Sequence, residues 1–271
     1  MEISRAGPLG PALGVFTGRY YPAPMVASAP GPVAPGGPQL IPRPTHWRIG
    51  DLAPWSHLAD RQLRLDGVAA AIAGREPAGL RGSSPTGSEQ QAAVLVGLYD
   101  QENPRVILTR RSRALLSHTN EVAFPGGRVD PADGDLWATA CREAFEETGM
   151  DTGGLQPVGR LDPHVTVGSR TIIHPFVAVL PRRPDLTPNP DEVEAIYHVP
   201  LGDLLDDQAW REERWETSLG PIVVTFFELD VDTVWGATAA ILRQLLALSL
   251  QVGEDGYRPC DGRGPAREDG L

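Results

Sequence analysis

Three glutamates, Glu143, Glu146 and Glu147, have the i, i+3, i+4 spacing that brings carboxylates together on one face of a helix. Like charges at this spacing repel each other by roughly 0.2–0.5 kcal/mol per pair. Clustered carboxylate oxygens are also the ligands that Mg²⁺ and Mn²⁺ bind. The three glutamates alone are compatible with a solvated acidic surface, but Gly126 and Gly127 stand at a fixed distance before them. Together, these residues predict a divalent-metal site and phosphate chemistry.

The residues around these glutamates predict a helix from Asp135 to Thr148. Gly149 follows directly and is the residue type that commonly ends a helix. The glutamates are expected on the polar face, where Arg142 can pair with Glu146 at i+4. The opposite, buried face is predicted from the less polar residues at helical spacing, which are Trp137, Cys141, Ala144, Phe145 and Thr148.

This segment resembles the Nudix box of the Nudix hydrolases, G-x5-E-x7-R-E-U-x-E-E-x-G-U, in which U is apolar. The second half matches from Arg142 to Met150, but Gly134 stands where the general pattern has Glu. The coenzyme A pyrophosphatase branch of the family has the variant G-G-x-x-D-x-x-D-x5-T-A-x-R-E-A-x-E-E-x-G. This chain fills every fixed position of that variant, with Gly126, Gly127, Asp130, Asp133, Thr139, Ala140, Arg142, Glu143, Ala144, Glu146, Glu147 and Gly149.

An upstream segment resembles the second motif of the same branch, L-L-T-x-R-S-x3-R-x3-G-x3-F-P-G-G. The chain matches from Ile107 to Ser112 and from Phe124 to Gly127, with Ile107 in place of Leu. It departs at Leu116, where the motif has Arg, and at Asn120, where it has Gly. Asn accepts positive φ better than most residues, whereas Leu removes a guanidinium suited to phosphate. Because the family associates this segment with coenzyme A recognition, these departures concern the substrate more than the chemistry.

The resemblance implies specific roles for individual residues. Metal ligands are expected to be Glu143, Glu146, Glu147 and the backbone carbonyl of Gly127. The residues assigned to catalysis are Glu143, Arg142, Glu146 and Glu192. Within this set, Arg142 is expected to orient a glutamate, and Glu143 and Glu192 are alternative general bases. An exposed loop acid is the simpler interpretation of Glu192. The residues assigned to substrate binding are Arg110, Arg111, Phe124 and Arg128.

The resemblance leaves three functions open. The first is the Mg²⁺- or Mn²⁺-dependent hydrolysis of coenzyme A or acyl-CoA to 3′,5′-ADP and 4′-phosphopantetheine or its acyl derivative. The second is another Nudix pyrophosphatase activity, on ADP-ribose, NADH or a nucleoside polyphosphate. The third is a non-catalytic Nudix-like nucleotide-binding module, which would have little need to retain Arg142 and all three glutamates.

Composition limits the partners. The net charge of −11 argues against nucleic acid, because binding a phosphate backbone requires a basic surface. No apolar run approaches the ~20 residues of a membrane span, so no membrane contact is expected. The two cysteines, Cys141 and Cys260, do not indicate a disulfide framework, and a cytoplasmic location fits. The expected partner is a small nucleotide-diphosphate substrate. The sequence allows a homodimer but fixes no oligomeric state.

The chain divides into four predicted parts. Residues 1–44 are rich in Pro, Gly and Ala and are expected to be a disordered extension. Residues 45–88 are expected to hold one short helix and a linker, and residues 253–271 a flexible polar tail. Residues 89–252 are expected to form the Nudix hydrolase domain. Its predicted strands lie at 92–98, 105–109, 156–161, 171–180, 193–199 and 222–227, before a last helix that is capped by Asp232 or Thr233 and continues to Leu250. This order predicts an α/β fold, and the resemblance implies a Nudix-type α/β/α sandwich with a mixed sheet.

Overall fold

The computed structural model describes residues 39–253, except 84, 114–119, 167–168, 219 and 231. Most of the predicted N-terminal extension and most of the predicted C-terminal tail therefore lie outside the described residues. Leu116 also lies outside them. None of the described helices is long and apolar enough to cross a membrane.

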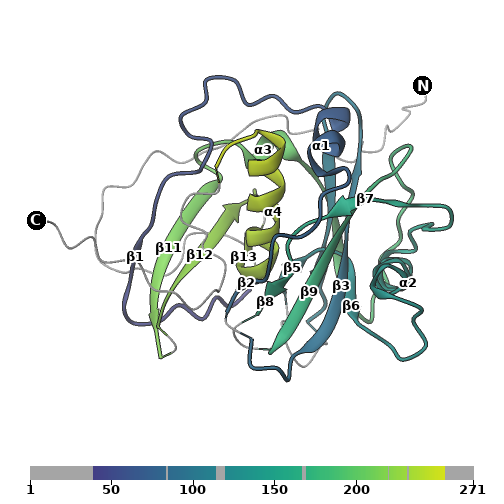
Figure 1. The fold of residues 1–271 in the computed structure, drawn as a ribbon, viewed down its shortest axis with the longest axis horizontal. Helices are drawn as coiled ribbons and strands as arrows, with labels where there is room; N and C mark the ends of the chain where they lie inside the picture. Colours follow the sequence, from purple (N-terminus) through teal and green to yellow (C-terminus); the bar gives the residue numbers. More distant parts are fainter. Residues whose placement is uncertain are drawn as a thin grey trace, which may run out of the picture. The chain divides into compact units, whose positions relative to one another are not determined.

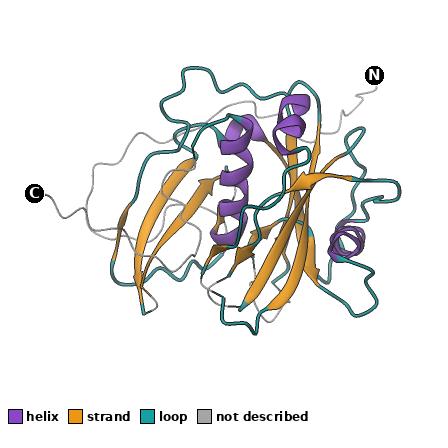
Figure 2. Cartoon of the chain, in the orientation of Figure 1, coloured by secondary structure: helices purple, strands orange, loops and turns teal. Residues whose placement is uncertain are grey.

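A mixed sheet of nine described strands forms the centre of the domain (Figures 1 and 2). Its order is β10-β4-β3-β9-β8-β2, with β5 paired to β4, β6 to β3 and β7 to β9. The central strand β3 runs parallel to β9 and antiparallel to β4 and β6, so the predicted mixed sheet is confirmed. Its strands are β2 (Arg81–Gly82), β3 (Gln90–Tyr99), β4 (Arg105–Arg111), β5 (Val122–Ala123), β6 (Gly126–Arg128), β7 (Pro157–Arg160), β8 (His164–Val165), β9 (Thr171–Val179) and β10 (Val193–Pro200).

Both faces of the central strand β3 are covered, which creates the predicted layers. Val94, Val96 and Leu98 belong to a core shared with α1 (Leu65–Ile72) and α4 (Gly236–Ser249). The alternate residues Ala93 and Leu95 belong to a second core, shared with α2 (Leu136–Thr148). Successive side chains of a strand point to opposite faces, so a central strand that is covered on both sides is apolar throughout. Figure 1 shows α2 on one side of the sheet and α1 and α4 on the other.

A second sheet adds a layer that the sequence did not predict. It has the order β1-β11-β12-β13 and packs on the side of α4 that faces away from the large sheet (Figure 1). Of its strands, the sequence predicted only part of β12. Strand β11 was not predicted, because it contains Glu212 and Glu213, whose charges obscure the strand pattern. Both are buried: Arg43 and Arg211 pair with Glu213, and the Asp51 amide donates to Glu212. The strands of the second sheet are β1 (Trp47–Ile49), β11 (Trp210–Thr217), β12 (Gly220–Glu228) and β13 (Thr233–Trp235). A short helix, α3 (Leu201–Leu204), precedes β11.

The predicted cap of the last helix is wrong. Thr233 begins strand β13, and α4 starts only at Gly236, with no side-chain hydrogen bond from its N-cap residue Trp235. The Asp232 carboxylate instead accepts hydrogen bonds from Arg110 and Tyr197. A buried acid that is already engaged by a guanidinium is not available to cap a helix, and the sequence does not show this long-range pairing.

The segment before the large sheet is joined to it by one buried carboxylate. Asp162, which follows β7, accepts hydrogen bonds from Arg75, the Ala78 amide, Arg81 and Gln244. These donors come from the residues after α1, from β2 and from α4. Although burial alone would raise the pKa of the Asp162 carboxyl, these hydrogen bonds lower it below its usual value.

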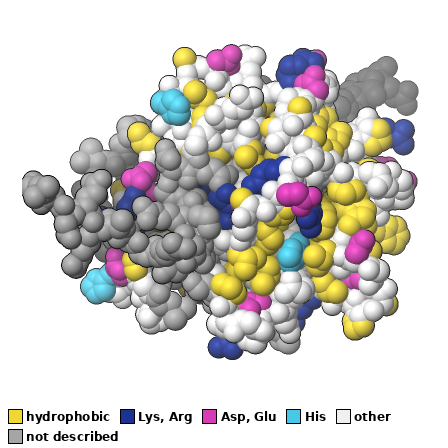
Figure 3. All heavy atoms as spheres, in the orientation of Figure 1, with side chains coloured by type: hydrophobic (Ala, Val, Ile, Leu, Met, Phe, Trp, Pro, Cys, Tyr) yellow, Lys and Arg dark blue, Asp and Glu magenta, His cyan; other side chains and the backbone are white. Residues whose placement is uncertain are grey.

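The visible face of the molecule mixes side-chain types. Figure 3 shows basic, acidic and apolar side chains interspersed over the large sheet and α2.

We expect Asp162→Ala to lower the free energy of unfolding by about 3–5 kcal/mol, because it removes a buried carboxylate that accepts hydrogen bonds from two arginines, a backbone amide and Gln244. The matched control is Asp207→Ala, which removes an exposed partner of Arg61 and should cost less than about 1 kcal/mol. The folded-state pKa of Asp162 is lowered, so its contribution is present above pH ~4 and is lost as the pH falls through the folded-state value. Urea unfolding of each variant from pH 7 downwards measures these differences. Equal losses in the two variants would contradict the assignment.

Candidate active site

Helix α2 places its three glutamates in three different environments. Glu147 is buried, the Glu143 side chain is 15% exposed and the Glu146 side chain is 49% exposed. The prediction of one shared polar face is therefore wrong. The buried stripe of α2 is displaced from the predicted one, so that Phe145 is 60% exposed and Glu147 faces the sheet. The small residues Ala140 and Ala144 make up this contact, with Thr139, Thr148 and Glu147 beside them. The limits of the helix are as predicted, with an Asp135 N-cap and Gly149 at φ 67°.

The buried carboxylate of Glu147 lies at the two glycines that begin β6. The Gly126 amide donates to its Oε2 at 3.2 Å, and a terminal nitrogen of Arg111 lies 3.7 Å from its Oε1. Burial, with smaller contributions from the negative charges of Glu143 and Glu192, raises the pKa of Glu147 to about 8. One amide and one distant guanidinium therefore do not fully compensate for the burial of this acid.

Glu143 lies directly against Gly127. A Cβ atom at position 127 would lie 2.4 Å from the carboxyl carbon of Glu143, which no real side chain permits. A side chain at position 127 would therefore displace the Glu143 carboxylate, whereas glycine lets this carboxylate approach the backbone of β6. Burial raises the pKa of Glu143, partly offset by Arg142, and the charges of Glu146 and Glu192 add to the increase.

Arg142 connects the acidic residues. Its Nε and one terminal nitrogen donate to the two oxygens of Asp133 at 2.9 and 3.0 Å. Its other terminal nitrogen donates to Glu143 at 3.0 Å and to Glu146 at 2.8 Å. The carbonyl oxygen of Arg128 takes the remaining N–H, at 3.2 Å. An arginine has five N–H donors, so the whole guanidinium is engaged within the protein.

Glu192 reaches the same site from a different part of the chain. The loop before β10 is attached to the end of α2, because the amides of Thr187 and Asn189 donate to the carbonyls of Thr148 and Glu147. These bonds satisfy carbonyl groups that a helix end otherwise leaves free. The charge of Glu192 raises the pKa of both Glu143 and Glu147, so its carboxylate lies within electrostatic range of both. The loop thereby gives Glu192 a position that the sequence only suggested.

The four residues predicted to bind substrate lie in different places. Arg110 and Arg111 are neighbours on β4 and point to opposite faces of the sheet. Arg111 faces Glu147, whereas Arg110 donates to the buried Asp232 on the α4 side, at 2.8 Å. Phe124 is 2% exposed and packs in the core beneath α4, and the side chain of Arg128 is exposed. The structure thus brings Arg111 to the glutamates but does not bring Arg110 or Phe124 there.

Of the two residues that depart from the upstream motif, the structure describes Asn120 but not Leu116. Asn120 has φ 60°, the left-handed conformation that glycine readily supplies, so this backbone geometry is retained. Its side chain accepts a hydrogen bond from Arg113 at 3.1 Å. Leu116 lies outside the described residues. The consequences of the loss of Arg at that position therefore rest on the sequence alone.

The oxygen donors suit a hard divalent cation, but they are not gathered around one point. Within residues 39–253, apart from the gaps given above, no three Asp, Glu, His or Cys side chains are placed to hold a metal ion. Glu143 and Glu146 instead accept hydrogen bonds from Arg142. Glu143, Glu147 and Glu192 still form a mutually repelling set, the chemistry that such a cation compensates. Glu146 is also a predicted ligand, but it differs from this set because its side chain is exposed and pairs with Arg142.

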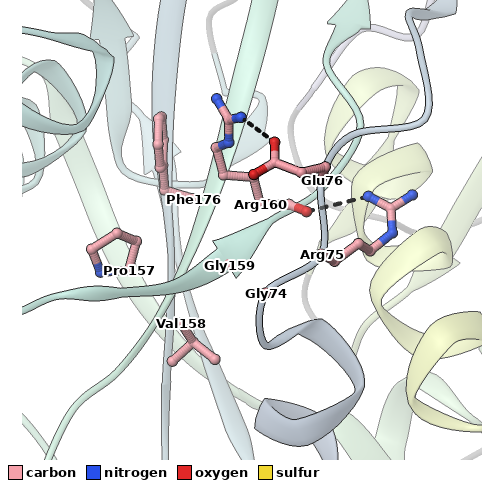
Figure 4. Close-up of a pocket in the computed structure, with 8 residues that line it drawn as sticks. All are labelled: Gly74, Arg75, Glu76, Pro157, Val158, Gly159, Arg160 and Phe176. Atoms are coloured by element: carbon pink, nitrogen blue, oxygen red, sulfur yellow. Dashed lines mark hydrogen bonds and ion pairs between the residues drawn. The ribbon is translucent and has the colours of Figure 1, made fainter.

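A surface depression elsewhere does not involve the glutamates. It lies between the residues after α1 and strand β7 (Figure 4). Its charged groups are paired with one another: Arg160 donates to Glu76 at 2.9 Å, and Arg75 donates to the Arg160 carbonyl at 3.2 Å. The depression offers an incoming ligand no uncompensated charge, so the chemistry centres on α2.

Sequence comparisons identify similar proteins. Residues 89–218 match the NUDIX domain family model. The protein "Uncharacterized Nudix hydrolase NudL" of Photorhabdus laumondii is 37% identical over 165 residues, which cover 61% of this chain and 87% of that protein. "Nudix hydrolase 22, chloroplastic" of Arabidopsis thaliana is 39% identical over 161 residues, which cover 56% of this chain and 53% of the relative. The chain thus spans about half the length of that plant protein.

Similarity to solved structures is weaker. The NUDIX domain of Shewanella oneidensis NrtR, complexed with ADP ribose, is 16% identical, with a TM-score of 0.37. The match covers 44% of this chain and 77% of that one, and it is too distant to inform the substrate.

We expect the burial of Glu147 to make the stability of the metal-free protein fall as the pH rises. The folded-state pKa is about 8, whereas an unfolded Glu titrates near ~4.3. Between these values only the folded state keeps the proton, so stability falls by up to about 1.4 kcal/mol per pH unit. Glu147→Gln should remove this dependence and be more stable than the wild type at pH 8.

Urea unfolding in EDTA at pH 5, 6.5 and 8 measures the effect. Glu146→Gln is the matched control, because it removes an exposed carboxylate of the same helix and should keep the wild-type pH dependence. If Glu147→Gln and the wild type lose stability equally between pH 5 and pH 8, Glu147 is not the buried acid responsible.

Proposed function

The chain belongs to the Nudix hydrolase family and is a hydrolase of acid anhydrides, and from this premise we propose that it cleaves the diphosphate of coenzyme A or acyl-CoA. The products are 3′,5′-ADP and 4′-phosphopantetheine or its acyl derivative. The observation that carries the proposal is the complete match to the branch-specific glycine–aspartate–glutamate motif, together with the geometry of that motif. Glu147 is buried against Gly126, Glu143 lies against Gly127, and Glu192 lies within electrostatic range of both.

Nudix hydrolases generally use divalent metal ions, and we infer Mg²⁺ or Mn²⁺ for this chain. Glu143, Glu147 and the Gly127 carbonyl are the groups that would hold the ion. Glu146 would join them only after leaving Arg142. When bound, such an ion neutralises the diphosphate oxygens and makes a nearby water more acidic. The support is the donor chemistry: carboxylate oxygens whose pKa values are raised, first by burial and then by the charges of neighbouring glutamates.

The remaining tasks fall to the protein's own side chains. Glu192 or Glu143 accepts the proton of the attacking water, and both are carboxylates of the same site. Glu143 also accepts a hydrogen bond from Arg142, and the two carboxylates remain alternative bases. Arg111 is the guanidinium that lies beside Glu147. Its Nε is buried with no acceptor among the described residues, so it retains hydrogen-bonding capacity for a phosphate.

The position of Leu116 supports a second substrate class. The upstream motif has Arg there, and losing a guanidinium removes a phosphate contact. ADP-ribose, NADH or a nucleoside polyphosphate is therefore the alternative substrate. The retained left-handed φ of Asn120 favours the first class, because the loop keeps the conformation that the motif glycine supplies.

We predict that the purified protein releases 3′,5′-ADP from coenzyme A in the presence of Mg²⁺ or Mn²⁺, and that EDTA abolishes the release. The measurement is separation of the products by liquid chromatography, with coenzyme A, ADP-ribose, NADH and a dinucleoside polyphosphate tested in parallel. Cleavage of ADP-ribose without cleavage of coenzyme A would establish the alternative. Nucleotide binding without any cleavage would leave a non-catalytic module.

Glu192→Gln should lower kcat by roughly 10²–10⁴-fold if Glu192 is the general base, which is the usual contribution of such a group. Glu194→Gln is the matched control, because this nearby acid pairs with Arg110 and Arg113 instead. Its kcat should stay within a few-fold of the wild type. A full loss in Glu143→Gln with near-normal turnover in Glu192→Gln would assign the base to Glu143.

A further inference from the structure

Asp133 is a carboxylate that the general Nudix pattern does not require at this position. That pattern has Glu eight residues before Arg142, and this chain has Gly134 there. The preceding residue, Asp133, makes the strongest contact with Arg142. Its two oxygens accept from Nε and one terminal nitrogen of the guanidinium at 2.9 and 3.0 Å. This is the two-bond geometry that makes arginine–carboxylate pairs directional.

Asp133 is itself fixed by its surroundings. Its Oδ2 also accepts from the Thr139 hydroxyl at 2.7 Å and from the Asp130 amide at 2.9 Å. The Asp133 amide in turn donates to the Asp130 carbonyl at 2.9 Å. These bonds hold a side chain that is only 5% exposed, although the loop around it is at the surface. Asp133 is therefore a rigid anchor for Arg142.

The anchored guanidinium determines the direction of two glutamates. With one edge held by Asp133 and one N–H held by the Arg128 carbonyl, the other terminal nitrogen points at Glu143 and Glu146. A freely rotating Arg142 side chain would not keep Glu143 at the surface of Gly127. Because all five N–H donors are engaged, Arg142 has none left for a substrate, and its effect on the reaction passes through the glutamates.

We propose that Asp133 is a positioning residue that replaces the glutamate missing at position 134, and that it sets the orientation of Glu143 through Arg142. The inference rests on the proposed function and deepens it. Asp133 touches neither the substrate nor the reacting atoms. It therefore acts on kcat and leaves the KM for the substrate largely unchanged. Removing a supporting carboxylate of this kind typically lowers activity roughly 10–100-fold.

The chain offers a direct test by exchange, because position 134 is open. A Cβ atom added to Gly134 would meet no other atom within 4 Å, so a side chain fits there. Glu is one methylene longer than Asp, which gives position 134 the additional reach. We expect Asp133→Ala to lower kcat about 10–100-fold and Asp133→Ala/Gly134→Glu to recover most of it. Asp133→Ala/Gly134→Gln has the same size without the charge and should not recover.

A second readout does not depend on activity. In metal-free, ¹⁵N-labelled protein, the Arg142 Nε–H should give a protected, slowly exchanging NMR resonance. Asp133→Ala should lose it, Asp133→Ala/Gly134→Glu should regain it, and Asp133→Ala/Gly134→Gln should not. Asp133→Asn retains one acceptor oxygen for Thr139 and Asp130. It therefore tests the charge even if Asp133→Ala does not fold.

The outcomes separate this inference from the proposed function. A wild type that cleaves none of the substrates defeats the proposed function, and the NMR series still decides whether Asp133 anchors Arg142. An active wild type with unchanged kcat in folded Asp133→Ala and Asp133→Asn overturns the inference alone. Recovery in the Gly134→Gln double variant as complete as that in the Gly134→Glu double variant also overturns it, because a charged anchor would then be unnecessary.

Discussion

The site depends on burying one acid, Glu147, where α2 packs against the two glycines that begin β6. A buried carboxylate is costly unless it is hydrogen-bonded and paired, and here it receives one amide and one guanidinium at 3.7 Å. Several nearby features follow from this constraint. The Gly126 amide donates to the acid, Arg111 points to this face of β4, and the loop before β10 attaches to the end of α2. The remaining imbalance raises the pKa of Glu147, an effect that a bound cation would oppose.

The two arginines at the end of β4 show how one strand serves both sides of the sheet. Arg111 belongs to the site on the α2 side, and Arg110 belongs to a buried pair with Asp232 on the α4 side. Tyr197 on β10 also donates to Asp232, and the pKa of Tyr197 is raised, first by burial and then by this bond. The second cluster connects the large sheet to the residues before β13. Two neighbouring, chemically identical residues therefore have separate tasks, one at the site and one in the fold.

Arg142 adds a competition to the site. It binds Glu146 and Glu143, which are also predicted metal ligands, so the protein's own cation occupies part of the acidic surface. The pairing reduces the repulsion among the glutamates and so stabilises α2 in the metal-free protein. It also makes the position of Glu143 depend on what holds the guanidinium. The site is consequently arranged in levels, from Asp133 to Arg142 to the glutamates.

Periodicity and motif spacing in the sequence predicted β3, β4, β7, β9 and β10 of the large sheet, the limits of α2 and the family, but not the short strands β2, β5, β6 and β8. These predictions rest on local properties: the apolar run of β3, a terminating Gly149 and fixed distances from Gly126 to Glu147. They also identified Asn120 as a residue suited to positive φ, which its backbone adopts. Such features need no knowledge of distant contacts, because neighbouring residues largely decide them.

Only the tertiary structure decided which side of α2 is buried, where β11 runs and what Arg110, Asp232 and Phe124 contact. The helical pattern alone favoured Phe145 as a core residue, but the small surface of Ala140 and Ala144 fits against the sheet and turns Glu147 inward. The charged residues of β11 concealed a strand because their partners, such as Arg43, lie far away in the sequence. Burial and ion pairing depend on distant parts of the chain, and therefore the folded structure, not the local pattern, determines them.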